Sequence, residues 1–212
     1  MLQVKDSMAR EVTTISAGHT AGEALALCRE RRIRHLPVLE DGGLVGIVSD
    51  RDLRSATPAF GDPARAAALA EVRVGDVMAR EVVTARPDDP IDTAANTMRE
   101  KKINCLPVLE GDELVGIVTS SDVMESLVYL LGAHEPGSRM EVVVPDKPGT
   151  LAGVAGLIGE LGVNIVSVVT DPRQRGEPPT RVAVFRVDTI NPLHAASVLE
   201  KAGYTVLWPP RP

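Results

Sequence analysis

Aromatic residues are scarce in this 212-residue chain, at 2% of the sequence, and there are only two cysteines, Cys28 and Cys105. The hydrophobic cores must therefore be built mainly from Val, Leu, Ile and Ala. Two cysteines are too few for the disulfide framework of a small secreted protein, and they fit a reducing compartment. We therefore expect a cytoplasmic protein.

An excess of basic charge is also missing, because the formal net charge is −6 at pH 7. A nucleic-acid-binding protein needs a basic surface that neutralises phosphates, so the charge argues against that class. No apolar run approaches the ~20 residues of a membrane span, and charges stand near the start, where a signal peptide needs its apolar stretch. We expect neither nucleic acid nor membrane as a partner.

What the chain does contain is an internal repeat. Val4–Asp52 returns as Val74–Asp122, shifted by 70 residues without a gap, and nearly half of the aligned positions are identical. A match of that length means that one supersecondary unit is used twice, and such units pack on each other to bury a common core.

Each copy contains hydrophobic patterns typical of both helices and strands. Four apolar positions at helical spacing predict a buried helix face in each copy: Ala21, Ala24, Leu25 and Cys28, then Ile91, Ala94, Ala95 and Met98. Thr20 with Glu23 predicts a capping box, and Asp89 before Pro90 predicts an N-cap. Two short apolar runs around a Gly/Asp-rich turn then predict a hairpin, followed by a second helix. The unit reads as strand, helix, strand, strand, helix.

The repeated Gly-Ile-Val-Ser/Thr-x-x-Asp segment has two interpretations. As structure, Ser or Thr followed three residues later by an acid is a capping box that opens a helix. As function, a hydroxyl at a helix N-terminus can bind phosphate, and a carboxylate one turn later can bind two ribose hydroxyls. Gly46 and Gly116 would then let a ligand approach the backbone closely.

Two copies of Leu-Pro-Val, a hairpin and this motif resemble a tandem pair of CBS domains, a regulatory module that binds adenine nucleotides. The resemblance implies that Asp52 and Asp122 hold ribose and that Ser49 and Thr119 face phosphate. Neighbouring positions complete the candidate set: Thr14, Arg34, His35, Leu36, Pro37 and Arg51 in the first copy, and Thr84, Asn104, Cys105, Leu106, Pro107 and Ser121 in the second. Pairs that keep the fold without the ligand are the alternative.

The two motifs differ in charge. The first copy places Arg51 and Arg54 around its aspartate. The second copy has Ser120, Ser121 and Met124 in this segment and no cation. Because guanidinium groups bind phosphate well, we expect the Asp52 site to prefer the more phosphorylated ligand.

The C-terminal segment follows a Gly/Pro/Ser-rich break and has the strand and helix order βαββαβ of a ferredoxin-like fold. Its residues Asp146–Ile165, "DKPGTLAGVAGLIGELGVNI", resemble an ACT domain, whose effectors are often amino acids bound where this turn meets a neighbouring subunit. The resemblance implies an effector site at Gly149, Thr150, Leu151, Asn164 and Ile165. A domain that only dimerises is the alternative. Glycines at every third position of the first helix predict a close helix contact.

The whole arrangement is similar to the acetoin utilisation protein B family (AcuB-like). The expected fold is α+β/α/β and multidomain: two βαββα CBS repeats packed as a pseudo-twofold pair, plus a ferredoxin-like βαββαβ ACT domain. We place the first CBS domain at 1–60, a linker at 61–72, the second CBS domain at 73–133 and the ACT domain at 139–209.

The expected function is that of a non-catalytic ligand sensor, because no catalytic constellation or metal-ligand spacing is present. The resemblance implies AMP, ADP, ATP or S-adenosylmethionine at the CBS pair, an amino acid at the ACT domain, and a homodimer. No cofactor is expected, and Mg²⁺ would come only with a polyphosphate. The alternative is an accessory subunit of an acetoin-related enzyme, acting by docking without a ligand.

Overall fold

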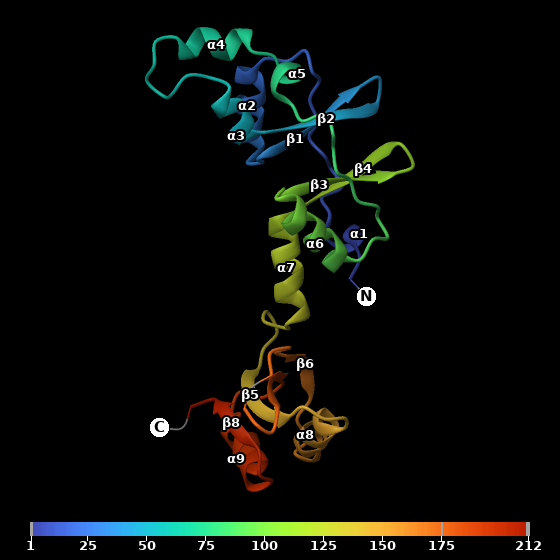
Figure 1. Cartoon of the computed structure of the whole chain (residues 1–212), viewed down its shortest axis with the longest axis vertical. Coiled ribbons are helices and arrows are strands. Elements are labelled where there is room, and N and C mark those ends of the chain that lie inside the picture. The colour runs from blue at the N-terminus through green and yellow to red at the C-terminus, as the bar shows by residue number, and fades with distance from the viewer. Residues whose placement is uncertain (1, 175, 211–212) are drawn as a thin grey trace. The chain divides into compact units, whose positions relative to one another are not determined.

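The computed structural model describes residues 2–174 and 176–210. The chain divides into two compact units, Met1–Ser126 and Leu127–Pro212, and each is described by itself. The first unit contains the first repeat and the second repeat as far as Ser126, and the second unit contains the end of the last helix of that repeat and the C-terminal segment (Figure 1). Within the described residues, no helix is both long enough and apolar enough to cross a membrane.

The two repeats have the same elements in the same order. The first contributes α1 (Val4–Ser7), α2 (Ala21–Arg31), β1 (His35–Glu40), β2 (Gly43–Ser49) and α3 (Asp50–Ser55). The second contributes α5 (Val74–Val77), α6 (Ile91–Lys101), β3 (Cys105–Glu110), β4 (Glu113–Thr119) and α7 (Ser120–Leu130). A further helix, α4 (Arg65–Glu71), lies between them in the chain.

The strand expected at the start of each repeat is only one residue long. Ile15 forms a parallel bridge with Val38, and Ala85 forms the same bridge with Val108. The residues before each bridge pair with the other repeat instead, because Ala9 lies opposite a residue of β4. The short helices α1 and α5, which the sequence did not predict, precede these crossings.

Each repeat completes the core of the other. Val4 on α1 is buried in the second repeat with Leu106 and Val118, and Val74 on α5 is buried in the first repeat with Leu36. Figure 1 shows α1 within the second repeat, next to α6. The prediction that the two repeats pack on each other as a pair is confirmed.

The repeated glycine of Gly-Ile-Val serves this exchange. A Cβ atom on Gly46 would lie 2.5 Å from the Met78 sulfur, and one on Gly116 would lie 2.5 Å from the Met8 sulfur. The expectation that these glycines admit a ligand is wrong, because a methionine of the other repeat occupies the space above each of them.

One of the two predicted helix caps is confirmed. Thr20 and Glu23 form the capping box of α2. The predicted cap at Asp89 is wrong, because Pro90 is the N-cap of α6 and has no side-chain capping bond. The Asp89 carboxylate instead accepts a hydrogen bond from the Arg86 N–H at 2.7 Å, within the turn that precedes the helix.

The second unit is a four-stranded antiparallel sheet with two helices. Its elements are β5 (Ser138–Pro145), α8 (Thr150–Glu160), β6 (Ile165–Thr170), β7 (Thr180–Val187), α9 (Leu193–Lys201) and β8 (Thr205–Trp208). The strand order is β6-β7-β5-β8. Val154 and Ile158 of α8, with Leu199 of α9, bury one face of the sheet around Phe185. This is the predicted ferredoxin-like arrangement.

The glycine row of α8 does not form the close helix contact that we expected. A Cβ atom on Gly153 would meet the Tyr204 hydroxyl at 2.8 Å, but Cβ atoms on Gly156 and Gly159 would meet nothing within 4 Å. Only the first glycine of the helix therefore has a packing role among the described residues.

Candidate functional site

In each repeat the motif folds into the same local hydrogen-bonded structure. Asp52 Oδ2 accepts hydrogen bonds from the Ser49 N–H at 2.9 Å and the Ser49 hydroxyl at 2.6 Å. Asp122 Oδ2 accepts the same two bonds from Thr119, at 2.6 and 2.7 Å. The capping interpretation is therefore correct as local structure. The other carboxylate oxygen, Oδ1, takes no part in these bonds in either repeat.

The start of the preceding strand lies beside this motif. His35 is opposite Ser49 in the β1–β2 hairpin, and the Asp50 N–H donates to the Arg34 carbonyl at 2.9 Å. In the second repeat, Cys105 is opposite Thr119, and the Ser120 N–H donates to the Asn104 carbonyl at 2.9 Å. Hairpin and helix start are thus joined at the same point in both copies.

The single-residue bridges bring the remaining candidates to this point. Ile15, which follows Thr14, donates its N–H to the Pro37 carbonyl at 3.1 Å, and Ala85, which follows Thr84, donates to the Pro107 carbonyl at 3.0 Å. The candidates of each copy therefore gather within their own repeat. One group contains Thr14, Arg34, His35, Leu36, Pro37, Ser49, Arg51 and Asp52; the other contains Thr84, Asn104, Cys105, Leu106, Pro107, Thr119, Ser121 and Asp122.

The candidates differ in how far solvent reaches them. The Leu-Pro pair is buried in both repeats, and Cys105 is buried as well. These residues are Leu36, Pro37, Leu106, Pro107 and Cys105. Asp52 and Arg51 are exposed, whereas Asp122 is half-buried.

Burial also sets the protonation of two equivalent positions. Burial lowers the pKa of His35, although the nearby carboxylates Asp50 and Asp52 act in the opposite direction. At the equivalent position of the second repeat, burial raises the pKa of the Cys105 thiol to about 12. At neutral pH both side chains are therefore uncharged.

A role of Arg54 towards the phosphates of a ligand stays a prediction, and in the structure this side chain is already paired. Its guanidinium lies 3.1 Å from the Asp50 carboxylate, four residues earlier on the same helix. Arg51, by contrast, is exposed and has no ion-pair partner among the described contacts.

The sequence reasoning did not assign a role to the shared "MAREV" segment. Ala9 exchanges backbone hydrogen bonds with Ile117, at 2.9 and 3.0 Å, and Ala79 does the same with Ile47, at 2.9 Å in both directions. The segment of each repeat thus pairs with the Gly-Ile-Val of the other. The segment has the same five residues in both copies, and this repetition was the sequence signal that could have pointed to the pairing.

The second unit separates the predicted effector residues. Gly149 and Thr150 line a pocket of about 620 Å³ together with Lys147 and Tyr204. Asn164 and Ile165 line another pocket, of about 680 Å³. Leu151 lines neither and is partly exposed. Within one chain, the five positions do not form a single site.

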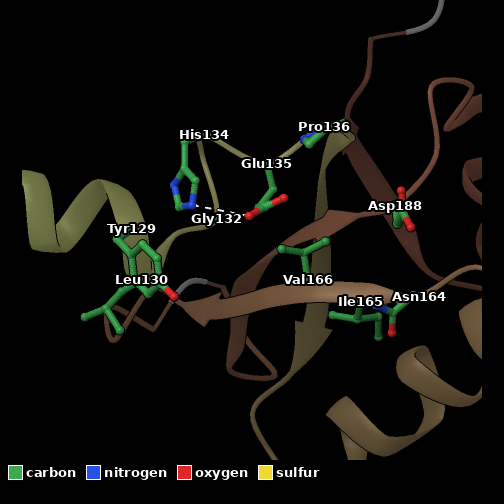
Figure 2. Close-up of a pocket in the computed structure, with 10 residues that line it drawn as sticks. All are labelled: Tyr129, Leu130, Gly132, His134, Glu135, Pro136, Asn164, Ile165, Val166 and Asp188. Carbon is green, nitrogen blue, oxygen red and sulfur yellow. Dashed lines mark ion pairs between the residues drawn. The ribbon is translucent and has the colours of Figure 1, made fainter. Parts of the chain in front are cut away.

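The larger pocket lies where the chain enters the second unit, and Figure 2 shows the residues that line it. The Tyr129 and His134 rings are stacked with their centroids 5.0 Å apart. The entering segment is fixed to the sheet, because the Ser167 hydroxyl donates to the Leu131 carbonyl at 2.8 Å. No group of three or more His, Cys, Asp or Glu residues that could hold a metal ion occurs in the described part of the chain.

Comparison with known proteins identifies both units. A model of the CBS domain family matches residues 4–58 and 74–129, and a model of the ACT domain family matches residues 138–203. Both domain types are regulatory modules. The first unit thus defines a CBS domain pair, and the second defines an ACT domain.

A solved structure has the same kind of CBS pair. A putative acetoin utilization protein (AcuB) from Vibrio cholerae is 35% identical, with a TM-score of 0.54, over 64% of this chain and 96% of that one. The chain belongs to the CBS domain proteins of the acetoin utilisation protein B type, with two CBS domains followed by an ACT domain.

Two other solved CBS proteins contain adenosine compounds. The CBS domain pair of protein MJ0100, in complex with 5′-methylthioadenosine and S-adenosyl-L-methionine, is 29% identical with a TM-score of 0.52, over 60% of this chain and 96% of that one. CBSX2 in complex with AMP is 26% identical with a TM-score of 0.54, over 61% of this chain and 99% of that one.

The curated relatives include proteins of very different length. The CBS domain-containing protein YhcV of Bacillus subtilis is 33% identical over 123 residues, which are 58% of this chain and 84% of that protein. The homoserine O-acetyltransferase of Methanohalobium evestigatum is 37% identical over 122 residues, which are 57% of this chain but 23% of that enzyme. The match to the enzyme thus spans less than a quarter of its length.

Proposed function

We propose that this protein is a non-catalytic ligand sensor whose CBS pair binds adenosine compounds: AMP, ADP, ATP or S-adenosylmethionine. Asp52 and Asp122 would hold the ribose, and Ser49 and Thr119 would face the phosphate. The adenosine ligands of the related CBS structures support this assignment. The domain limits given above, 1–60, 73–133 and 139–209, are part of the same proposal.

One observation carries the proposal most directly. In both repeats the Ser/Thr-x-x-Asp motif uses only Oδ2 of its aspartate for capping, so that Oδ1 can accept hydrogen bonds from a ligand. A helix cap alone requires one carboxylate oxygen, and the second oxygen suits the vicinal hydroxyls of a ribose. The other candidates lie around each motif and would line the ligand site.

We further propose a homodimer and an amino-acid effector at the ACT domain. The edge strands β6 and β8 expose Val168, Val169, Leu207 and Trp208, each by more than 40%. Unpaired edges with apolar side chains favour pairing with a second chain. A partner chain could also bring its Asn164 and Ile165 to Gly149 and Thr150, which lie in separate pockets within one chain. Mg²⁺ would enter only as a complex with ATP, and the location would be the cytoplasm.

The test is a set of melting curves with AMP, ADP, ATP and S-adenosylmethionine. A ligand at about 100 times its dissociation constant adds about 2.7 kcal/mol to the free energy of unfolding. Asp52→Ala and Asp122→Ala should each remove part of the ligand-induced shift. Because either variant also loses a helix cap, the shift is measured against the same variant without ligand.

Asp112→Ala is the matched control, because Asp112 is exposed in the β3–β4 turn, at the other end of the strand from Thr119. It makes the same change of charge and should retain the full shift. If none of the four compounds moves the melting curve of the unaltered protein, the sensor assignment is wrong.

The alternative is an accessory subunit that docks on an acetoin-related enzyme without a ligand. The exposed apolar residues of α7 favour this function: Met124, Leu127, Val128 and Leu130. Co-purification with such an enzyme, together with melting curves that no adenosine compound moves, would support it over the sensor.

A further inference from the structure

The two CBS motifs occupy equivalent places in the fold, yet they differ in charge. Arg34 in the first repeat corresponds to Asn104 in the second, and Arg51 corresponds to Ser121. These pairs are 70 residues apart, the same shift as in the rest of the repeat. The difference therefore reflects side-chain chemistry and not a change in local structure.

The structure brings the two arginines together. Arg34 is the residue before β1, and its carbonyl accepts the N–H of Asp50, the residue before Arg51, at 2.9 Å. Both side chains are exposed, and neither guanidinium has a partner among the described contacts. The backbone thus places two exposed arginines next to the Asp52 motif.

The other charged groups near the first motif do not change the difference between the two motifs, because Arg32 is matched by Lys102 in the second repeat and both are exposed. Arg54 is paired with Asp50 at 3.1 Å, so the two charges offset each other. His35 is neutral at pH 7, because burial lowers its pKa. The α3 helix has only six residues, so the attraction for phosphate must come from the arginine side chains and not from the helix terminus.

The second motif has a carboxylate but no arginine at the two positions that correspond to Arg34 and Arg51. The Ser120 hydroxyl donates to Asn104, to its carbonyl at 3.3 Å and to Oδ1 at 3.4 Å, so this side chain is engaged locally. Lys5, on the α1 helix that packs here, is paired with Asp88 at 2.6 Å. The second motif therefore carries two positive charges fewer than the first at these positions.

The segments that cross between the repeats contribute equally to both sites. Arg10 Nη2 donates to the Lys5 carbonyl at 3.1 Å, and Arg80 Nη2 donates to the Gly75 carbonyl at 3.0 Å. Because each repeat receives one such arginine in the same position, these arginines do not cause a difference in charge between the two sites.

We infer that the two sites sort adenosine ligands by charge. The Asp52 site takes an adenine nucleotide with two or three phosphates, which Arg34 and Arg51 bind. The Asp122 site takes a neutral or cationic adenosine derivative, so that Thr119 faces the 5′ substituent of the ribose and not a phosphate. The inference rests on the proposed function, because it names the ligand class of each site that the function requires.

Calorimetry with ATP and with adenosine tests the inference on the full chain. The variant Arg34→Asn/Arg51→Ser gives the first site the residues of the second. A hydrogen bond to a charged group contributes about 1.5–3 kcal/mol, so we expect ATP binding to weaken about tenfold or more for each arginine. Adenosine binding should change less than about twofold, because no phosphate contacts are lost.

The reciprocal variant, Asn104→Arg/Ser121→Arg, is the matched control. It should strengthen ATP binding at the second site, measured in an Asp52→Ala background so that the first site does not contribute. Both substituted positions are exposed and only the long Ser120–Asn104 side-chain contact of 3.4 Å is lost, so the melting temperature without ligand should stay close to that of Asp52→Ala alone. Added KCl should weaken ATP binding more in the unaltered protein than in Arg34→Asn/Arg51→Ser, because screening acts on the two charges.

The outcomes separate the inference from the function on which it rests. If neither ATP nor adenosine binds the unaltered protein, the proposed function fails. If both bind but Arg34→Asn/Arg51→Ser retains its affinity for ATP, or if ATP binds equally at the two sites, sorting by charge is wrong and the sensor function stands.

Discussion

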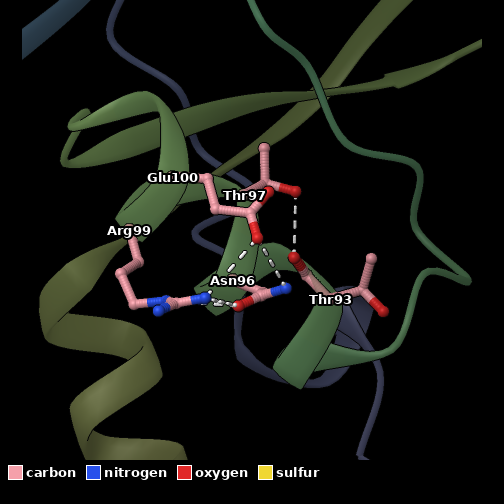
Figure 3. Close-up of polar contacts among 5 residues, drawn as sticks. All are labelled: Thr93, Asn96, Thr97, Arg99 and Glu100. Carbon is pink, nitrogen blue, oxygen red and sulfur yellow. Dashed lines mark hydrogen bonds and ion pairs between the residues drawn. The ribbon is translucent and has the colours of Figure 1, made fainter.

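The two CBS repeats share a buried framework and differ on their surfaces. On the first repeat, α4 packs against α2 so closely that a Cβ atom on Gly22 would lie 3.0 Å from the Leu69 carbonyl oxygen. On the second repeat, the equivalent face of α6 carries Asp92 in place of that glycine, and Figure 3 shows polar contacts along it. There the Arg99 Nη2 donates to Asn96 Oδ1 at 2.7 Å.

This difference shows which parts of a duplicated unit are constrained. Apolar positions that complete the cores are kept in both copies, because either repeat must fill the space that the other leaves. The helix faces and the charges around the motifs are free to diverge. Differences in ligand preference should therefore be sought on these surfaces.

The largest expected effect comes from breaking the shared framework. Gly46→Val places a side chain where the Met78 sulfur lies, and Gly116→Val does the same at Met8. Overpacking of this kind costs up to about 3 kcal/mol, and we expect similar losses in the two variants. Urea unfolding measures them. A loss in one variant only would mean that the two contacts are not equivalent.

A smaller effect is expected where the repeats differ. Gly22→Asp introduces the residue of the second repeat and should push α4 away, at a net cost of about 1 kcal/mol after the gain in helix propensity. Amide exchange of α4 should rise. The reciprocal Asp92→Gly removes no packing and should leave α4 exchange unchanged; unchanged exchange in Gly22→Asp as well would contradict the contact.

The smallest effect is a difference in pH dependence between positions 35 and 105. Burial lowers the pKa of His35 below 6.5, so its contribution to stability is present above that pH and declines as the pH falls and the unfolded chain takes up the proton. The raised pKa of Cys105, about 12, has the opposite sign: its contribution is present below pH 9.0 and declines as the pH rises towards 12.

The exchange variant His35→Cys tests this difference. It should flatten the fall in urea midpoint between pH 7 and pH 5, while the alkaline side becomes steeper. An acid side that keeps its slope would show that another group causes it.

Much of the fold could be predicted from the sequence, because the apolar positions of the repeat and the βαββαβ order follow directly from hydrophobic periodicity. The packing of α1 and α5 against the opposite repeat could not be predicted, because no local sequence pattern indicates which copy Val4 packs against. For the same reason Gly46 was interpreted as a ligand contact, although a methionine 32 residues later in the chain fills the space above it.

The candidate sites were only partly predictable. The Ser/Thr-x-x-Asp spacing predicted the local hydrogen bonds of Asp52 and Asp122 correctly, because a capping box is set by spacing alone. The charge around the two aspartates was not predicted correctly, because Arg54 forms an i, i+4 ion pair with Asp50, and this pair competes with any role of Arg54 towards a ligand. Arg34 is remote in sequence, and only the hairpin brings it to Arg51.

The most direct test of the central claim is a crystal structure of the protein grown with saturating ATP. The account predicts the ribose hydroxyls on Oδ1 of Asp52 and the phosphate chain beside Arg34 and Arg51. ATP bound elsewhere in the molecule, or an ordered Asp52 motif with no nucleotide, would contradict it.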